Sequence, residues 1–203
     1  VIKHTDLTKN RLILINDKST DENILGLLNS FKNQYTSLNV IVLDNEINLG
    51  FVGTVNKGME YSDSDVILLN SDTEVSDFWL EEMEKCAYSQ EDVATVTALS
   101  NNATLASVPN GLQPNNLPDS MSFDEYANMV YSRSLRRYPQ IPTAHGFCMY
   151  IRRNVLDVVG LFDQETFGKG YAEENDFSYR CMDFGYKHLL CDSVIVYHKE
   201  SQS

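Results

Sequence analysis

The sequence predicts a single α/β domain with a mostly parallel central sheet and helices on both faces. Three observations carry this prediction. Short apolar runs alternate with helical patterns along the 203 residues, the runs show little polar alternation, and 42% of the residues are hydrophobic. Apolar runs without alternation are typical of strands buried on both faces, as in parallel sheets. No internal repeat or second domain is evident, so we expect residues 1–203 to form one domain.

The first half of the chain is predicted to repeat strand and helix. Apolar runs predict strands over residues 11–16, 39–44, 65–70 and 93–98. Helical patterns between them predict helices over 20–32, from 48 to about 61, and over 76–89. Doubly wound sheets generally open with a central strand, whereas residues 1–5 resemble the tail of a helix. We therefore expect the domain to lack its first strand and most of its first helix.

The second half begins with a long loop over residues 100–118, rich in Asn, Pro, Ser and Gly. Loops of this length in compact domains are commonly functional or mobile. The later elements are predicted as a helix over 123–137, a strand over 146–151, a short helix over 154–159, a flexible stretch at 168–170, a helix beginning at 173 and a strand over 194–197. The last strand delivers His198 at its end.

Charge and composition exclude several partners. The chain carries 16 basic and 29 acidic side chains, for a net charge of −13, and its one short basic cluster (Arg133, Arg136, Arg137) is too small to bind nucleic acid. No apolar run approaches the ~20 residues that cross a bilayer, and no signal peptide opens the sequence.

The cysteines show no metal-ligand spacing. Four are present, and we expect Cys148 and Cys191, in or beside apolar runs, to be small buried hydrophobes. Zinc or a disulfide framework is therefore the less favoured interpretation, and a reducing, cytoplasmic compartment follows.

Polar residues follow the predicted strands. In open parallel sheets, ligands bind beyond the carboxyl ends of the strands. The side chains at those ends are Asn16, Asp17, Asp44, Asn70, Asp72 and His198. Carboxylates are hard oxygen ligands for Mg²⁺ or Mn²⁺, and an imidazole favours Mn²⁺. The alternative is that Asp and Asn are simply common in turns.

The segment Asp65-Val-Ile-Leu-Leu-Asn-Ser-Asp-Thr-Glu74 resembles the Asp-x-Asp signature of nucleotide-sugar glycosyltransferases with the GT-A fold. That signature holds a divalent cation on the donor diphosphate, and the resemblance makes Asp72 the direct metal ligand, with Asn70 in place of the first acid. Haloacid-dehalogenase-like phosphatases share the pattern, but they need the first Asp as a nucleophile. An amide at Asn70 cannot play that part.

A second motif runs from Gly168 to Arg180 and contains Glu-Glu-Asn-Asp. It resembles the Glu-Asp-x-Asp block of glycosyltransferase family 2. The resemblance gives Glu174 the place of the catalytic base, Glu173 that of the preceding Glu, and Asp176 that of the following acid. The alternative is structural, because acids are favoured in the first turn of any helix and Asp176 with Arg180 suits an i, i+4 ion pair.

Three further blocks resemble the same family in order and spacing. Leu12 to Asp21 resembles its base-binding strand end, with Asn16 and Asp17 at the contact positions. Asn48-Leu-Gly-Phe51 through Gly58 resembles the helix start that supports the nucleotide, and His198 resembles the strand-end His that completes the metal site. The donor-binding residues implied by the resemblance and the strand ends together are Asn16, Asp17, Asp44, Asn48, Gly50, Asn56 and Asn70.

The candidates for binding the acceptor are two loop segments and a few single residues. The loop over 100–118 and the stretch over 167–172 are candidates for acceptor recognition and closure. Asn101, Asn102 and His145 could contact the acceptor, and Trp79 could stack on a sugar, although core packing is the commoner role of such a tryptophan.

Together these blocks predict an inverting glycosyltransferase of family 2 with a Mn²⁺ or Mg²⁺ cofactor and Glu174 as general base. The resemblance implies a nucleotide-sugar donor, a saccharide or lipid-linked saccharide acceptor, and surface polysaccharide synthesis at the inner face of the membrane, with possible peripheral contact. Two alternatives stay open: a non-catalytic nucleotide-sugar-binding module, and a sugar-phosphate nucleotidyltransferase, whose Gly-rich basic opening loop is not seen.

Overall fold

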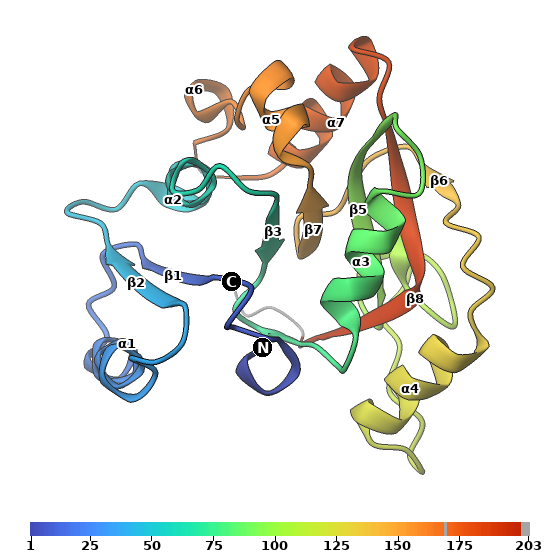
Figure 1. Cartoon of the computed structure of the whole chain (residues 1–203), viewed down its shortest axis with the longest axis horizontal. Helices are drawn as coiled ribbons and strands as arrows, with labels where there is room; N and C mark the ends of the chain where they lie inside the picture. The colour runs from blue at the N-terminus through green and yellow to red at the C-terminus, as the bar shows by residue number, and fades with distance from the viewer. Residues whose placement is uncertain (169, 200–203) are drawn as a thin grey trace.

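Two separate sheets and the helices around them make up the computed structural model, which describes residues 1–168 and 170–199 (Figure 1). The smaller sheet pairs β1 (Leu12–Asn16) with β2 (Val40–Asp44) in parallel, and α1 (Glu22–Gln34) connects them. The larger sheet has the order β3-β7-β5-β8-β4, with β6 also pairing β8. Its strands are β3 (Val66–Leu69), β4 (Thr73–Glu74), β5 (Val93–Ser100), β6 (Gln140–Ile141), β7 (Cys148–Ile151) and β8 (Lys187–His198).

The α/β class is confirmed, but the sheet is mixed rather than mostly parallel. β5 and β8 pair in parallel, whereas β7 lies antiparallel between β3 and β5. β4 and β6 also pair with β8 in the antiparallel sense. A short, fully buried apolar run looks the same in either direction, so the sequence pattern of β7 could not reveal its orientation.

Helices cover both faces of the larger sheet, as predicted (Figure 1). On one face α3 (Trp79–Ala87) packs Met83 and Cys86 against Val96 of β5. The other face is covered by α2 (Gly50–Glu60), α5 (Arg153–Val159) and α7 (Glu173–Asp183). The remaining helices are α4 (Phe123–Arg133), α6 (Gln164–Phe167) and the 3₁₀ turns Ile2–His4 and Thr104–Ala106. All four cysteines are buried free thiols, as expected for Cys148 and Cys191.

Helix ends agree with the sequence where a side chain caps them. The Asp21 side chain accepts a hydrogen bond from the Asn23 N–H, and Ser122 forms a capping box with Glu125. The helix expected from residue 76 begins only at Trp79, because Thr73–Glu74 forms β4 and Phe78 precedes the helix at φ 61°. No helix in the described ranges is long and apolar enough to cross a bilayer.

Candidate functional site

The ends of β1 and β2 bring several predicted donor-binding residues into one cluster. Asn16 and Asp44 lie opposite each other, and Asn16 Nδ2 donates to Asp44 Oδ1 over 3.1 Å. The neighbouring Asp17 accepts hydrogen bonds at Oδ1 from Asn45 Nδ2 (2.8 Å) and from the Leu49 N–H (2.7 Å). Asp17 therefore fastens the end of β1 to the start of α2.

The start of α2 is held in a tight turn. Asn48 donates to the Asp17 carbonyl and accepts from the Gly50 N–H, and Gly50 has φ 71°, which favours glycine. Burial acts to raise the pKa of Asp17, but hydrogen bonds from Asn45, Leu49 and Thr54 outweigh it and lower the pKa. Asp17 is thus held as a carboxylate beside the helix N-terminus.

Lys57 is a member of this cluster that the sequence analysis missed. Its Nζ donates to Asn45 Oδ1 (2.6 Å) and to the Asp44 carbonyl (3.2 Å). The only signal in the sequence is its place on α2, two turns after Gly50, where a cation can reach back to the strand ends. Lys57 brings positive charge to the site, as does Lys32, whose Nζ lies 3.0 Å from Asp44 Oδ2.

Asn56 is the predicted donor residue that the structure places elsewhere. It is 8% exposed, donates to the Phe162 carbonyl and accepts from the Phe162 N–H. Both polar groups of its side chain are used inside the protein, so Asn56 joins α2 to the segment before α6 and is not open to a ligand.

Asp72 and His198 form the second cluster. Thr73, directly after Asp72, pairs with His198 across β4 and β8, and His198 Nε2 lies 3.3 Å from Asp72 Oδ1. His198 Nδ1 lies 3.0 Å from the Asn102 carbonyl, which can only accept a hydrogen bond. Nδ1 therefore donates to that carbonyl, and Nε2 is the ring nitrogen nearer to Asp72.

This pair fits a divalent cation. His198 Nε2 is buried and has no hydrogen-bond partner, although it faces Asp72. A cation between the two groups would satisfy both this buried nitrogen and the Asp72 carboxylate, and an imidazole oriented by a carbonyl at its other nitrogen is the usual arrangement of a metal-binding histidine. Within residues 1–168 and 170–199, no third His, Cys, Asp or Glu joins a metal-binding group. Two protein ligands suit Mg²⁺ or Mn²⁺ with phosphate and water completing the coordination.

The third cluster is the first turn of α7. Glu174 is partly buried, and its carbonyl accepts a hydrogen bond from Ser178 Oγ (2.6 Å). Glu173 is 5% exposed, and its Oε2 has no hydrogen-bond partner. Burial, with the neighbouring Glu174 charge, raises the pKa of Glu173. The two acids therefore differ in character, with Glu174 the more accessible of the two.

Residues 144–147, here called the 144–147 segment, connect the second and third clusters. At one end the Ala144 N–H donates to Ser178 Oγ of α7 (3.1 Å). At the other, the Phe147 carbonyl accepts from the Asn70 N–H (2.9 Å), and the Phe147 ring stacks on His198 with centroids 5.5 Å apart. One short stretch of chain therefore contacts both the helix of Glu174 and the Asp72–His198 pair.

His145 lies within the 144–147 segment, and the charge of Glu174 acts on its pKa. Its N–H donates to Thr97 Oγ1 (3.1 Å), and its Nε2 is buried without a partner. Burial lowers the pKa of His145, and the negative charge of Glu174 opposes that shift. Neither Phe147 nor Thr97 was found from the sequence, because their contacts depend on β7 lying beside β5 and β8.

Several predicted residues have structural contacts instead. Trp79 is 4% exposed and donates from Nε1 to Thr5 Oγ1, so its ring is packed in the core and cannot stack on a sugar. Asn101 exchanges hydrogen bonds with the backbone of His198. Asp176 pairs with Arg180 Nε (2.8 Å), the i, i+4 alternative considered from the sequence. Lys169, in the stretch expected to close over the donor, lies outside the described residues.

Comparison with known proteins agrees with this arrangement. A search of curated proteins finds no significant match. The structure of GalNAc-T7 with UDP, GalNAc and Mn²⁺ superimposes with a TM-score of 0.74 at 18% identity, over 97% of this chain and 39% of that one. The mannosyltransferase PcManGT from Pyrobaculum calidifontis, in complex with GDP-Man and Mn²⁺, superimposes with a TM-score of 0.68 at 14% identity, over 97% of this chain and 50% of that one. The chain thus spans half or less of either protein, and the fold it shares with them is the GT-A fold. The family model described as Glycosyl transferase family 2 matches residues 2–160, so the chain belongs to glycosyl transferase family 2.

Proposed function

We propose that this domain transfers a sugar from a nucleotide-diphosphate donor to a saccharide acceptor, with inversion at the anomeric carbon. The observation that carries the proposal is the 144–147 segment. It contacts the helix that bears a carboxylate base, through Ser178, and the ring of His198 beside Asp72. A metal-bound leaving group and a base to activate the acceptor are the two requirements of such a transfer.

The donor would bind at the ends of β1 and β2. The first turn of α2 presents the positive end of the helix dipole, which favours phosphate, while the Leu49 and Gly50 N–H groups are bonded to Asp17 and Asn48. Lys57 adds a cation beside Asn45 and Asp44. Asp17 and Asp44 provide carboxylate groups for the nucleoside, as the sequence resemblance implies, and Asn16, whose amide is bonded to Asp44 and to the Ser19 N–H, positions Asp44.

Asp72 and His198 would hold Mn²⁺ or Mg²⁺, consistent with the Mn²⁺ in both similar structures. When bound, such a cation acts as a Lewis acid that neutralises the diphosphate leaving group. The net charge of −13 makes this neutralisation more important, because an anionic donor is otherwise repelled.

Glu174 would remove the proton from the acceptor hydroxyl as that oxygen attacks the anomeric carbon. Its partly buried position and its anchored backbone keep the carboxylate at one place at the start of α7. Glu173 is 5% exposed, so an acceptor hydroxyl reaches it less readily than it reaches Glu174. Asn70 fixes the 144–147 segment through its backbone.

Donor hydrolysis tests the proposal. We expect Mn²⁺-dependent release of UDP or GDP from one member of a nucleotide-sugar panel, with water as the acceptor. Glu174→Gln should lower the rate by about 10²–10⁴-fold, the usual effect of losing a general base, and leave donor binding unchanged. The matched control is Glu165→Gln, an exposed acid on α6, which should keep full activity.

Donor binding without metal-dependent turnover would contradict the enzyme and favour the non-catalytic binding module. Asn70, in place of the first metal-site acid, is the residue that keeps this second candidate open.

In the described part of the chain, β1 pairs only with β2 and β3 pairs only with β7, so each strand keeps an unpaired edge. A role in surface polysaccharide synthesis at the cytoplasmic face of a membrane, with a saccharide or lipid-linked acceptor, completes the proposal.

A further inference from the structure

Two adjoining hollows lie between the chain after Asp72 and helix α4. The larger, of about 470 Å³, is lined by β4, the first turn of α4 and the N-terminal turn. The smaller, of about 80 Å³, continues between Ser76–Phe78 and α4. Asp124 lines both hollows, so they adjoin at the first turn of α4, and the two together are here called the groove. The larger hollow alone is within the ~300–1,000 Å³ range of small-molecule sites.

The groove lies beside β4, the strand that directly follows Asp72. Thr73 lines its near end, directly follows Asp72 and pairs with His198. Its far end lies at Phe78 and Tyr131, at the start of α3 and the second half of α4. A molecule lying in the groove could therefore extend from the site of transfer to these two aromatic rings.

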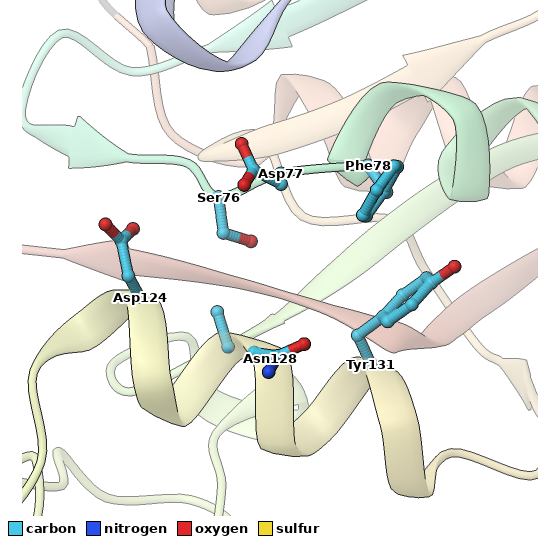
Figure 2. A pocket seen from close by; sticks show the side chains of 7 residues that line it. Ser76, Asp77, Phe78, Asp124, Asn128 and Tyr131 are labelled. Atoms are coloured by element: carbon cyan, nitrogen blue, oxygen red, sulfur yellow. The ribbon is translucent and has the colours of Figure 1, made fainter.

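The wall contributed by α4 is the polar face of that helix, opposite the buried Tyr126. Asp124, Asn128 and Tyr131 are spaced i, i+4 and i+7, so they share one face of the helix. Figure 2 shows these three side chains on α4, with Ser76, Asp77 and Phe78 on the segment opposite. Carboxylate, amide and hydroxyl groups facing one another across a groove are suited to bind a ligand with many hydroxyl groups.

The far end of the groove offers an aromatic surface. The rings of Phe78 and Tyr131 stack with centroids 5.2 Å apart and an interplanar angle of 23°. Phe78 is nevertheless 54% exposed, and its backbone has φ 61°, a costly conformation for a bulky residue. Aromatic faces carry negative partial charge, which attracts the slightly positive C–H groups on one side of a pyranose ring.

The charged groups along the groove are already paired. Lys3 Nζ lies 3.2 Å from Asp124 Oδ2, and His4 Nδ1 lies 2.6 Å from Asp77 Oδ1, so these carboxylates leave little free charge for an ionic ligand. A neutral ligand with hydroxyl groups suits this balance better than a cationic one.

We propose that this groove binds the acceptor as a neutral oligosaccharide, with a sugar unit beyond the reacting one stacked on Phe78. The inference rests on the proposed function, since it names the class of acceptor that the transferase uses. The enzyme would then extend an existing saccharide chain, because a single sugar at Asp72 leaves the far end of the groove empty.

Saturation-transfer NMR tests the groove without any donor. The probes are cellohexaose, maltohexaose and chitohexaose, each added to the unmodified protein, and tetramethylammonium as a cationic competitor. We expect one hexasaccharide to bind, with its ring C–H protons receiving the strongest transfer. Phe78→Ala and Asp124→Ala should each weaken binding at least 10-fold. Phe184→Ala, which removes an equally exposed phenylalanine at the end of α7, should leave it unchanged.

Three results would overturn the inference: no binding by any hexasaccharide, binding unaffected by Phe78→Ala and Asp124→Ala, or displacement by tetramethylammonium. The rate of donor hydrolysis is also measured for the same variants. It tests the proposed function, whereas saccharide binding by NMR tests the groove. Phe78→Ala should keep hydrolysis within 2-fold of the unmodified protein, because water needs no groove. Absence of hydrolysis in the unmodified protein would count against the transferase and leave saccharide binding to be judged by NMR.

Discussion

β2 and β7 are both short apolar strands, but the protein buries them to different extents. Every residue of β7 is buried, as are all but one of β5. In contrast, Val40–Leu43 of β2 and Leu12–Ile15 of β1 are only partly buried, and α1 has no buried residue at all. The apolar runs look alike in the sequence, so the difference comes from the layers packed around each strand.

Because of this contrast, the residues of the candidate site lie on two units that differ in how well they are packed. The donor cluster of Asn16, Asp17 and Asp44 stands on the thinly covered β1–α1–β2 unit. Asp72, His198 and Glu174 stand on elements of the larger sheet and its helices, where the core is deepest. We infer that the metal and base positions are rigid and that the nucleotide end of the site opens more readily.

The largest expected effect is on the free energy of unfolding, when an isoleucine is replaced by alanine in each of the two regions. Ile151→Ala in β7, at a fully buried site, should lower the free energy of unfolding by about 2–5 kcal/mol. Ile41→Ala in β2 removes the same atoms from a partly buried site and should cost less than about 1.5 kcal/mol, because less apolar surface returns to water. Urea unfolding monitored by circular dichroism measures both. Equal losses would contradict the contrast between the two units.

A smaller expected effect is on the pH dependence of stability, through the buried carboxyl group of Glu173 in the better-packed region. Burial raises the pKa of Glu173, so folding favours its protonated form. That contribution to stability is present below the pKa of the unfolded chain, about 4.3, and is lost as pH rises through the folded value. Glu173→Gln should therefore stabilise the protein at pH 7 by about 1 kcal/mol, or roughly 2–4 °C in Tm, with little effect at pH 3.

Calorimetry at both pH values checks this expectation, with Glu165→Gln as the exposed control. A gain of the same size at pH 3 and pH 7 would show that the effect of Glu173→Gln is not due to the buried charge.

The strands that carry the predicted site were found in the sequence because each is an apolar run ending in a polar residue. β1, β2 and the end of β8 position Asn16, Asp44 and His198 in this way. The start of β8 was missed, since Asp192 and Ser193 interrupt the run where the pairing of β8 with β5 shifts register. β4 and β6 have only two residues each and exist through pairing with β8, which no local pattern reveals.

Local motifs identified residue types but not how their side chains are used. Asn56 and Trp79 match positions at which ligand contact was expected, yet tertiary contacts with Phe162 and Thr5 occupy their polar groups. Of the residues that join the clusters, Phe147 belongs to no motif, and Ser178 lies within the Gly168–Arg180 motif but had no predicted role. Their roles depend on β7 and α7 meeting in space, which a one-dimensional pattern does not encode.

Paramagnetic broadening by Mn²⁺ is the most direct test that the metal pair and the base share one cleft. With UDP or GDP present, Mn²⁺ should broaden the amide NMR signals of Asp72, His198, Phe147 and Glu174 together and spare those of α1. Asp72→Asn should abolish the pattern. Broadening at Asp72 and His198 that leaves Glu174 and His145 sharp would separate the two clusters and contradict the account.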